Sequence, residues 1–336
     1  MPWKGEKDPY KIWLSEIILQ QTRVEQGLNY YHRFIQTFPD VHQLAKAPDA
    51  KVFKLWEGLG YYTRCRNLIA TARYISDELK GRFPATYEGI KALKGIGPYT
   101  AAAISSFAFN LPHAVVDGNV FRVLSRVYGI ATPIDSTEGK KSFSQLANDN
   151  LDKDQPGIYN QAIMDFGAII CKPAAPLCGD CVFNKTCFAF THNKINELPV
   201  KEKKITIKKR WFYYLVLEAE GKMAIQQRIK KDIWQHLYEF PVMEMTKETD
   251  TKRIVEQAEK SGLLLKNKYE VVGISPLFKQ QLSHQLIAGQ FITIRLTKKS
   301  GINNEVTWVT KNELKKFAFP KFVNQYLDNK EMQILC

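Results

Sequence analysis

The sequence predicts a chain of two domains, an all-α domain followed by an α+β domain. Apolar residues recur every three to four positions from Pro9 to about Asn193, which is typical of amphipathic helices. Runs typical of strands begin only after a strongly basic segment. The chain has 336 residues, enough for two domains of average size, about 150 residues each. We therefore expect domains at 1–195 and 211–336, joined by a basic linker at 196–210.

The first domain is predicted to contain about ten helices separated by short breaks rich in Gly, Pro and Asp. The helical spacing is clear at Ile12, Leu14, Ile17 and Ile18 near the start of the chain. The breaks fall at residues 38–40, 80–84, 94–98 and 117–118.

The second domain combines strand-like and helix-like runs. We expect strands at residues 211–217, 223–227, 269–274, 290–296 and 305–309. We expect helices near 250–261 and 311–328.

Charge and composition point to a polyanionic partner. The net charge is +14, and residues 201–210 contain six Lys or Arg and one Glu. Such a basic balance favours nucleic acid, although a solubilising surface charge would give the same total. No apolar run approaches the ~18 residues of a membrane span, and the first residues lack the apolar core of a signal peptide. We expect no membrane association and a cytoplasmic location, or a nuclear or mitochondrial one in a eukaryote.

The cysteines indicate a metal centre. Four of the six lie within 17 residues in the pattern C-x6-C-x2-C-x5-C, whereas Cys65 and Cys336 are remote. The four are Cys171, Cys178, Cys181 and Cys187. Reduced thiolates packed so closely suit a 4Fe–4S cluster, because structural zinc usually takes two separated pairs of ligands. Zinc and coincidental buried cysteines are the alternatives.

A turn with two glycines suggests contact with phosphate. In Leu-Lys-Gly-Ile-Gly-Pro-Tyr-Thr-Ala, Gly95 and Gly97 lie between two helical segments. Such a turn lets the backbone approach a phosphate, and the N–H groups of the next helix then face it. This is the form of a helix–hairpin–helix, a DNA clamp that is independent of sequence, although the turn could also be an ordinary connection.

Two acidic residues have unusual neighbours. Glu16 lies in the apolar segment Ile-Trp-Leu-Ser-Glu-Ile-Ile-Leu, where an ionised carboxylate is costly and a raised pKa would suit a general acid. The alternative is an ordinary acid on an exposed face. Asp117 precedes Gly-Asn-Val-Phe-Arg, where it could also simply cap the following helix.

Taken together, these segments resemble the adenine DNA glycosylase (MutY) family of the endonuclease III superfamily. The resemblance spans nearly the whole chain and rests on several long motifs in order. These are residues 14–24 (LSEIILQQTRV), 56–62 (WEGLGYY), 116–120 (VDGNV), 160–168 (NQAIMDFGA) and the cysteine loop.

The resemblance implies roles for the two acids. Glu16 would protonate the ring of a flipped-out adenine, and Asp117 would stabilise the positively charged sugar, as paired carboxylates do in sugar hydrolases. Tyr99 and Asn119 would position the sugar, Asp117 or the attacking water. Related enzymes that also nick the strand place a lysine at the position of Tyr99, and a phenol cannot form their Schiff base. A monofunctional glycosylase is therefore implied.

The resemblance also assigns residues to the substrate and to DNA. Those matching the adenine pocket are Trp3, Leu19 and Gln161, and those matching the base stack beside the lesion are Gln21 and Tyr61. The partner would be duplex DNA with adenine opposite 8-oxoguanine or guanine, bound by a monomer.

The second domain resembles the MutT-like, Nudix-fold lesion-recognition domain of the same family. The matching pieces are residues 234–241 (WQHLYEFP) and Ser283-His284, which would contact the DNA lesion. The acidic helix of the pyrophosphatases, R-E-x-x-E-E, is absent from residues 247–256. We therefore expect binding rather than nucleotide hydrolysis. An endonuclease III-like lyase for oxidised pyrimidines and a non-catalytic iron–sulfur DNA-binding protein are the alternatives.

Overall fold

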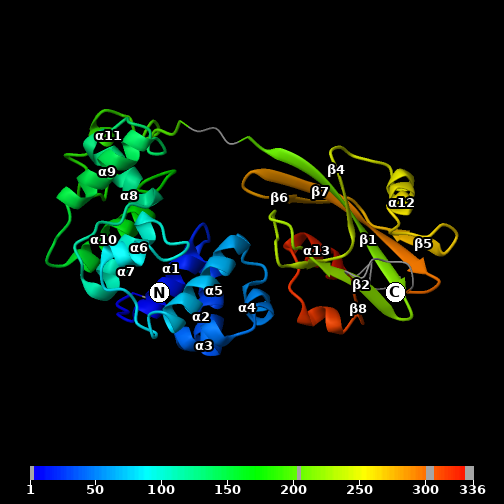
Figure 1. The fold of residues 1–336 in the computed structure, drawn as a ribbon. Helices are drawn as coiled ribbons and strands as arrows, with labels where there is room; N and C mark the ends of the chain where they lie inside the picture. The colour runs from blue at the N-terminus through cyan, green and yellow to red at the C-terminus, as the bar shows by residue number, and fades with distance from the viewer. Residues whose placement is uncertain (1–3, 203–205, 300–305, 330–336) are drawn as a thin grey trace. The chain divides into compact units, whose positions relative to one another are not determined.

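The computed structural model describes residues 4–202, 206–299 and 306–329 (Figure 1). The chain divides into two compact units. The first comprises Met1–Ala47 and Thr63–Lys204, and the second Pro48–Tyr62 and Ile205–Cys336. Helix α4 (Asp49–Trp56) thus groups with the strand-rich unit. The domain limits expected from the sequence stay a prediction.

The first unit is helical in its described residues, which confirms the predicted all-α class. Its helices are α1 (Pro9–Leu19), α2 (Val24–Thr37), α3 (Val41–Lys46), α5 (Tyr62–Asp77), α6 (Tyr87–Lys91), α7 (Pro98–Phe109), α8 (Gly118–Tyr128), α9 (Thr137–Asp149), α10 (Pro156–Ile169) and α11 (Phe188–Thr191). Among the described residues, no helix of the protein is long and apolar enough to cross a membrane.

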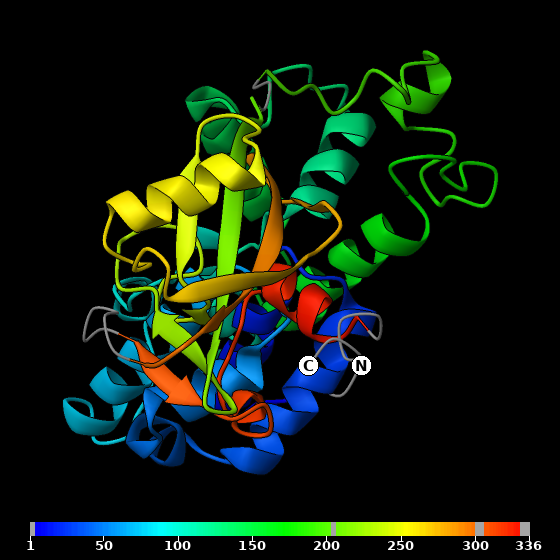
Figure 2. The ribbon, with the colours of Figure 1, turned by 90° about the vertical axis from the view of Figure 1, so that its right-hand side faces the viewer.

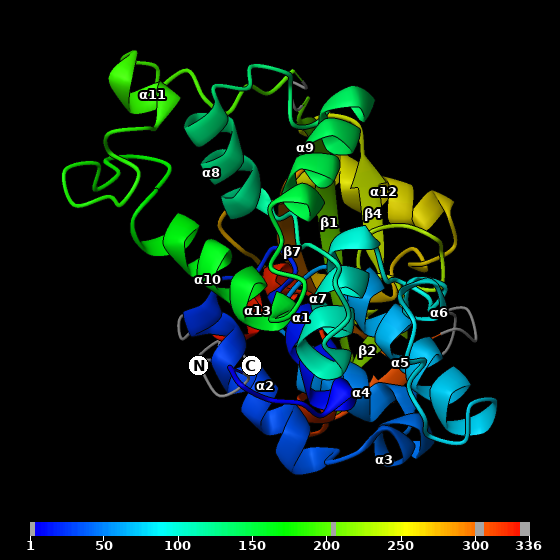
Figure 3. The ribbon, with the colours of Figure 1, turned by 90° about the vertical axis from the view of Figure 1, so that its left-hand side faces the viewer.

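Helix α1 lies at the centre of this unit, in contact with α2 and α7 (Figure 3). It is buried on nearly all sides from Tyr10 to Ile18, which explains why its sequence is almost continuously apolar. It begins where the side chain of Asp8 accepts a hydrogen bond from the Tyr10 amide, with Pro9 at the first helical position. The helix that carries Glu16 is therefore fixed by the core rather than by surface contacts.

The second unit is built on a mixed sheet with the strand order β3-β2-β1-β7-β5. The strands are β1 (Lys208–Ala219), β2 (Lys222–Gln227), β3 (Tyr238–Glu239), β4 (Val242–Met245), β5 (Tyr269–Ile274), β6 (Phe278–Gln281), β7 (Gln285–Leu296) and β8 (Thr307–Val309). The long strands β1 and β7 are parallel, whereas β4 pairs with β1 and β6 with β7 in antiparallel fashion. Strand β1 begins at Lys208, so the end of the expected linker is part of the sheet.

The two faces of β1 carry different cores, as expected from the alternation of side chains along a strand. Tyr213 and Leu215 point to a core that includes Ile254 of α12 (Thr251–Lys260), and Figure 2 shows α12, in yellow, lying across the strands. On the other face, Tyr214 stacks on Phe291 and contacts Phe322 of α13 (Lys321–Leu327). A sheet between helices confirms the predicted α+β class.

Candidate active site

Glu16 lies on α1 and is buried, with 8% of its surface exposed. Burial raises its pKa to about 7, the charge of Asp117 adds to this rise, and a hydrogen bond from Tyr99 opposes it. The interpretation of Glu16 as an acid on an exposed face is therefore wrong. A carboxyl group that keeps its proton near neutral pH is suited to donate it.

Tyr99 joins Glu16 to the start of α7. Its hydroxyl is hydrogen-bonded to Glu16, and burial raises the pKa of the phenol well above its usual value. The same oxygen lies 3.7 Å from Sδ of Met164 on α10. Three elements far apart in the sequence thus meet at the buried carboxyl.

Asp117 is both the cap of α8 and a member of this site. Its Oδ1 accepts hydrogen bonds from the amides of Asn119 (2.9 Å) and Val120 (2.8 Å). Its Oδ2 accepts one from Nδ2 of Asn119 (2.8 Å). Asp117 therefore caps α8, as the sequence suggested. It also lies close enough to Glu16 to raise the pKa of that residue.

The role of Arg122 was not predicted from the sequence. Its Nη2 donates to Oδ1 of Asn119 (2.8 Å) and to the carbonyl of Gly167 (2.7 Å). Its Nε donates to the carbonyl of Cys171 (2.7 Å). Arg122 therefore orients the amide that contacts Asp117 and ties it to the first residue of the cysteine loop.

A second arginine, Arg64, was not predicted from the sequence either, and it holds the end of α1. Nη1 of Arg64 donates to the carbonyls of Ile17 (2.9 Å), Ile18 (2.8 Å) and Gln20 (2.6 Å). A helix leaves its last carbonyls without partners, and a cation is favourable at that end. The next residue, Gln21, is exposed and has a left-handed backbone (φ 54°). Arg64 thus fixes the backbone immediately before the expected base-stack residue.

The structure describes two of the three residues expected to line an adenine pocket. Leu19 is the half-buried last residue of α1. Gln161 lies on α10, half-buried, with its Nε2 donating to Oδ1 of Asp165 (3.0 Å). Trp3 lies outside the described residues. The contact of Met164 with Tyr99 shows that α10 borders the site.

The hairpin has the features expected of a phosphate clamp. It connects α6 to α7, and Gly95 adopts a left-handed backbone (φ 81°) against Asn67, where an added Cβ would lie 2.7 Å from that side chain. Gly97 caps α7 without a side-chain hydrogen bond, and it is exposed together with Pro98. The first N–H groups of a 12-residue helix therefore stay available to an anion.

The four clustered cysteines line one apolar cavity in the first unit. Cys171, Cys178, Cys181 and Cys187 are free thiols and share this cavity with Phe166, Ile170 and Leu177. Arg126 closes it, with Nη1 lying 3.5 Å from Sγ of Cys171. In the described part of the chain, no three His, Cys, Asp or Glu side chains are arranged to hold a single metal ion.

In the second unit, Ser283 and His284 form the exposed tip of the hairpin between β6 and β7. The hydroxyl of Ser283 lies 2.6 Å from that of Tyr61, which has a left-handed backbone (φ 48°). Two residues assigned to DNA contact, 222 positions apart, thus lie side by side.

A helix–hairpin–helix beside the buried Glu16 and the half-buried Asp117 defines a DNA glycosylase of base excision repair. Residues 14–148 match the HhH-GPD superfamily of base excision DNA repair proteins, and residues 212–329 match the NUDIX domain family. The chain is 34% identical to the adenine DNA glycosylase of Buchnera aphidicola subsp. Baizongia pistaciae, over 97% of this chain and 91% of that protein. This chain belongs to the adenine DNA glycosylase family.

A further relative and two solved structures are also similar to this chain. The human adenine DNA glycosylase is 41% identical over 56% of this chain and 36% of its own length. The solved structure of a thermostable thymine-DNA glycosylase is 30% identical, with a TM-score of 0.54, over 57% of this chain and 88% of that one. A trapped endonuclease III–DNA intermediate shares the fold, with 20% identity and a TM-score of 0.51 over 56% and 87% of the two chains.

Proposed function

We propose that this enzyme removes adenine opposite 8-oxoguanine or guanine in duplex DNA, hydrolysing the glycosidic bond and leaving the strand uncut. The observation that carries the proposal is the buried Glu16, held next to Tyr99 and Asp117 with a pKa of about 7. A tyrosine in place of a lysine at residue 99 supports a monofunctional reaction, because a phenol cannot form a Schiff base with the sugar.

The two carboxyl groups divide the chemistry between them. Glu16, protonated by virtue of its burial, donates its proton to the adenine ring, which makes the base a better leaving group. The carboxylate of Asp117, which accepts a hydrogen bond from Asn119, stabilises the positive charge that develops on the sugar as the bond breaks. Adenine leaves with the electron pair of the glycosidic bond and with the proton from Glu16. Water then adds to the sugar cation and gives up one proton, which restores the protonated form of Glu16.

One duplex assay separates the proposal from its two alternatives. With adenine opposite 8-oxoguanine, we expect a cut in the adenine strand only after treatment with alkali, because hydrolysis leaves an abasic site. A bifunctional lyase acting here would cut without alkali, and an enzyme for oxidised pyrimidines would not cut this strand. Binding without any alkali-labile product would identify a non-catalytic DNA-binding protein.

The cysteine loop fits a 4Fe–4S cluster, held by Cys171, Cys178, Cys181 and Cys187. Its donor set is thiol only, and an apolar shell surrounds it, which is the environment of such clusters in proteins. When bound, the cluster would cross-link the loop and hold its basic residues in place.

Replacing one ligand, Cys178→Ser, is expected to lower the iron content from about four atoms per chain. We expect it to weaken DNA binding more than the single-turnover excision rate, because the loop lies outside the acid pair. Cys65→Ala, at a buried cysteine remote from the loop, is the matched control. Iron analysis and visible absorbance of anaerobically prepared protein measure the result. One zinc and no iron would overturn the cluster.

The tip of the β6–β7 hairpin is proposed to recognise 8-oxoguanine. This base differs from guanine by a carbonyl and a ring N–H, and a serine hydroxyl both donates and accepts. The double change Ser283→Ala with His284→Ala should lower the preference for 8-oxoguanine over guanine by about three- to tenfold, as expected for one or two hydrogen bonds of about 0.5–1.5 kcal/mol each. Equal slowing with both partners would show that the tip holds DNA without recognising the lesion.

A further inference from the structure

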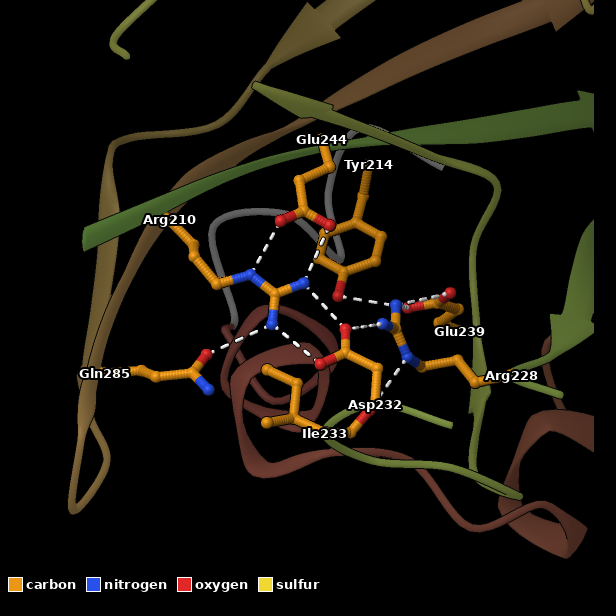
Figure 4. A network of polar contacts seen from close by, with 8 residues as sticks. All are labelled: Arg210, Tyr214, Arg228, Asp232, Ile233, Glu239, Glu244 and Gln285. Carbon is orange, nitrogen blue, oxygen red and sulfur yellow. Dashed lines mark hydrogen bonds and ion pairs between the residues drawn. The ribbon is translucent and has the colours of Figure 1, made fainter. Parts of the chain in front are cut away.

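A network of charged side chains lies beside this tip in the second unit (Figure 4). At its centre is Arg210 on β1, of which only 8% is exposed. Its Nε and Nη2 donate to the two carboxylate oxygens of Glu244 on β4 (2.6 and 2.7 Å). Its Nη1 and Nη2 donate to those of Asp232 (2.9 and 2.6 Å). Two bidentate pairs of this kind fix the plane of the guanidinium group.

The fifth N–H of Arg210 reaches the tip. A guanidinium group has five N–H donors, and the second one on Nη1 donates to Oε1 of Gln285 (3.1 Å). Gln285 is the first residue of β7 and follows His284 directly. Every N–H of Arg210 thus has an acceptor, and one acceptor belongs to the hairpin.

A second arginine holds the network from the other side. Nη2 of Arg228 donates to Oδ2 of Asp232 (3.1 Å), and its Nη1 donates to both oxygens of Glu239 (2.8 and 2.7 Å). The two arginines are thus shared among three carboxylates, Asp232, Glu239 and Glu244. The cations are neutralised by the protein itself, so the network is a support and not a binding site for phosphate.

The tip has few other contacts with the sheet. The hairpin closes through the Leu282 amide, which donates to the carbonyl of Gln285 (2.7 Å). The carbonyl of His284 accepts from the amide of Lys208 on β1 (3.0 Å). Ser283 and His284 themselves are exposed. The ladder between β1 and β7 ends at the pair of Lys208 and Gln285. The tip beyond this pair is held by the backbone contact at Lys208, by the hydrogen bond between Ser283 and Tyr61, and by the side-chain contact between Arg210 and Gln285.

We propose that Arg210, acting through Gln285, is a positioning residue for recognition of the base opposite adenine. It touches neither the DNA nor the reacting atoms, and it fixes the position of the β6–β7 tip relative to β1. This inference rests on the proposed role of Ser283 and His284. Positioning of this kind matters because a recognition group supported loosely by its surroundings loses much of its selectivity.

The test removes the hydrogen bond between Arg210 and Gln285. Gln285→Met keeps the length of the side chain and leaves the carboxylate pairs of Arg210 intact. Single-turnover excision of adenine is measured opposite 8-oxoguanine and opposite guanine, with the full-length protein. We expect the ratio of the two rates to fall by about two- to fivefold, as for one lost hydrogen bond. Gln290→Met is the matched control, since Gln290 lies on the same strand but donates to the carbonyl of Ser275 (3.0 Å).

A second variant acts at the other end of the contact. Arg210→Lys keeps the charge but lacks the planar fork, so it should lower the same ratio. Thermal unfolding of each variant shows whether the second unit stays folded. An equal fall in both excision rates, with the ratio unchanged, would assign the network to stability alone and overturn the inference.

Comparison with the tip variant separates this inference from the proposed function. If Ser283→Ala with His284→Ala leaves the ratio unchanged, the proposed function of the tip fails, and the inference fails with it. If the tip variant lowers the ratio and Gln285→Met does not, only the inference is wrong. Adding Gln285→Met to the tip variant should lower the ratio no further, because residues that act as a unit are not additive. An additive fall would show that Gln285 acts independently of the tip.

Discussion

Glu16→Gln is expected to abolish measurable adenine excision while leaving binding to duplex DNA nearly unchanged. Glutamine fills the same buried space on α1 but has no proton to donate to the base. General acid catalysis contributes about 10²–10⁴-fold, and so poor a leaving group places the loss at the upper end of that range. Single-turnover excision and an equilibrium binding assay measure the two properties on the same duplex.

The pH profile identifies Glu16 as the source of that loss. Burial raises the pKa of Glu16 to about 7, and only the protonated form acts as an acid. Excision by the unaltered enzyme should therefore fall as pH rises through about 7, and any residual activity of Glu16→Gln should lack this fall. Glu25→Gln, the same change on an exposed position of α2, is the control. A Glu16→Gln enzyme with a near-normal rate would remove Glu16 from the mechanism.

Asp117→Asn should lower excision by about 10²–10³-fold, the usual cost of removing one preorganised electrostatic contact to a transition state. Asparagine caps helices about as well as aspartate, so the oxygen can still accept from the amides of Asn119 and Val120. The negative charge facing the sugar is lost, together with the contact from Nδ2 of Asn119. Excision rate and thermal stability are measured side by side.

A second aspartate, Asp40, provides a control that separates the capping role of Asp117 from the role of its charge. Asp40 caps α3, where its Oδ1 accepts from the amide of Gln43 (2.9 Å). The change Asp40→Asn therefore measures how much thermal stability is lost when asparagine replaces aspartate at the start of a helix that has no chemical role. A similar small fall in stability for both variants, with excision lost only in Asp117→Asn, is the expected result. Retained excision in Asp117→Asn would leave Asp117 with the capping role alone.

The sequence by itself determined the two classes of structure and most of the long elements. Strand β5 was predicted at residues 269–274 and is observed there, and the helix near 250–261 is α12. These elements carry their own periodicity, so local residues are enough to indicate them. The short strands β3, β4 and β6 were not predicted. Each has two to four residues and pairs with a longer strand elsewhere in the chain, which the local pattern does not show.

The tertiary structure decided how the chemical groups are supported. An acid in an apolar segment suggested that Glu16 was unusual, but its burial and its contact with Tyr99 depend on α7 and α1 meeting. Arg64 contacts carbonyls 44 to 47 residues away, and Arg210 reaches Gln285 across 75 residues. Each arginine looks like an ordinary surface cation in the sequence. Its role appears only when the fold removes it from water and leaves hydrogen-bond acceptors as its partners.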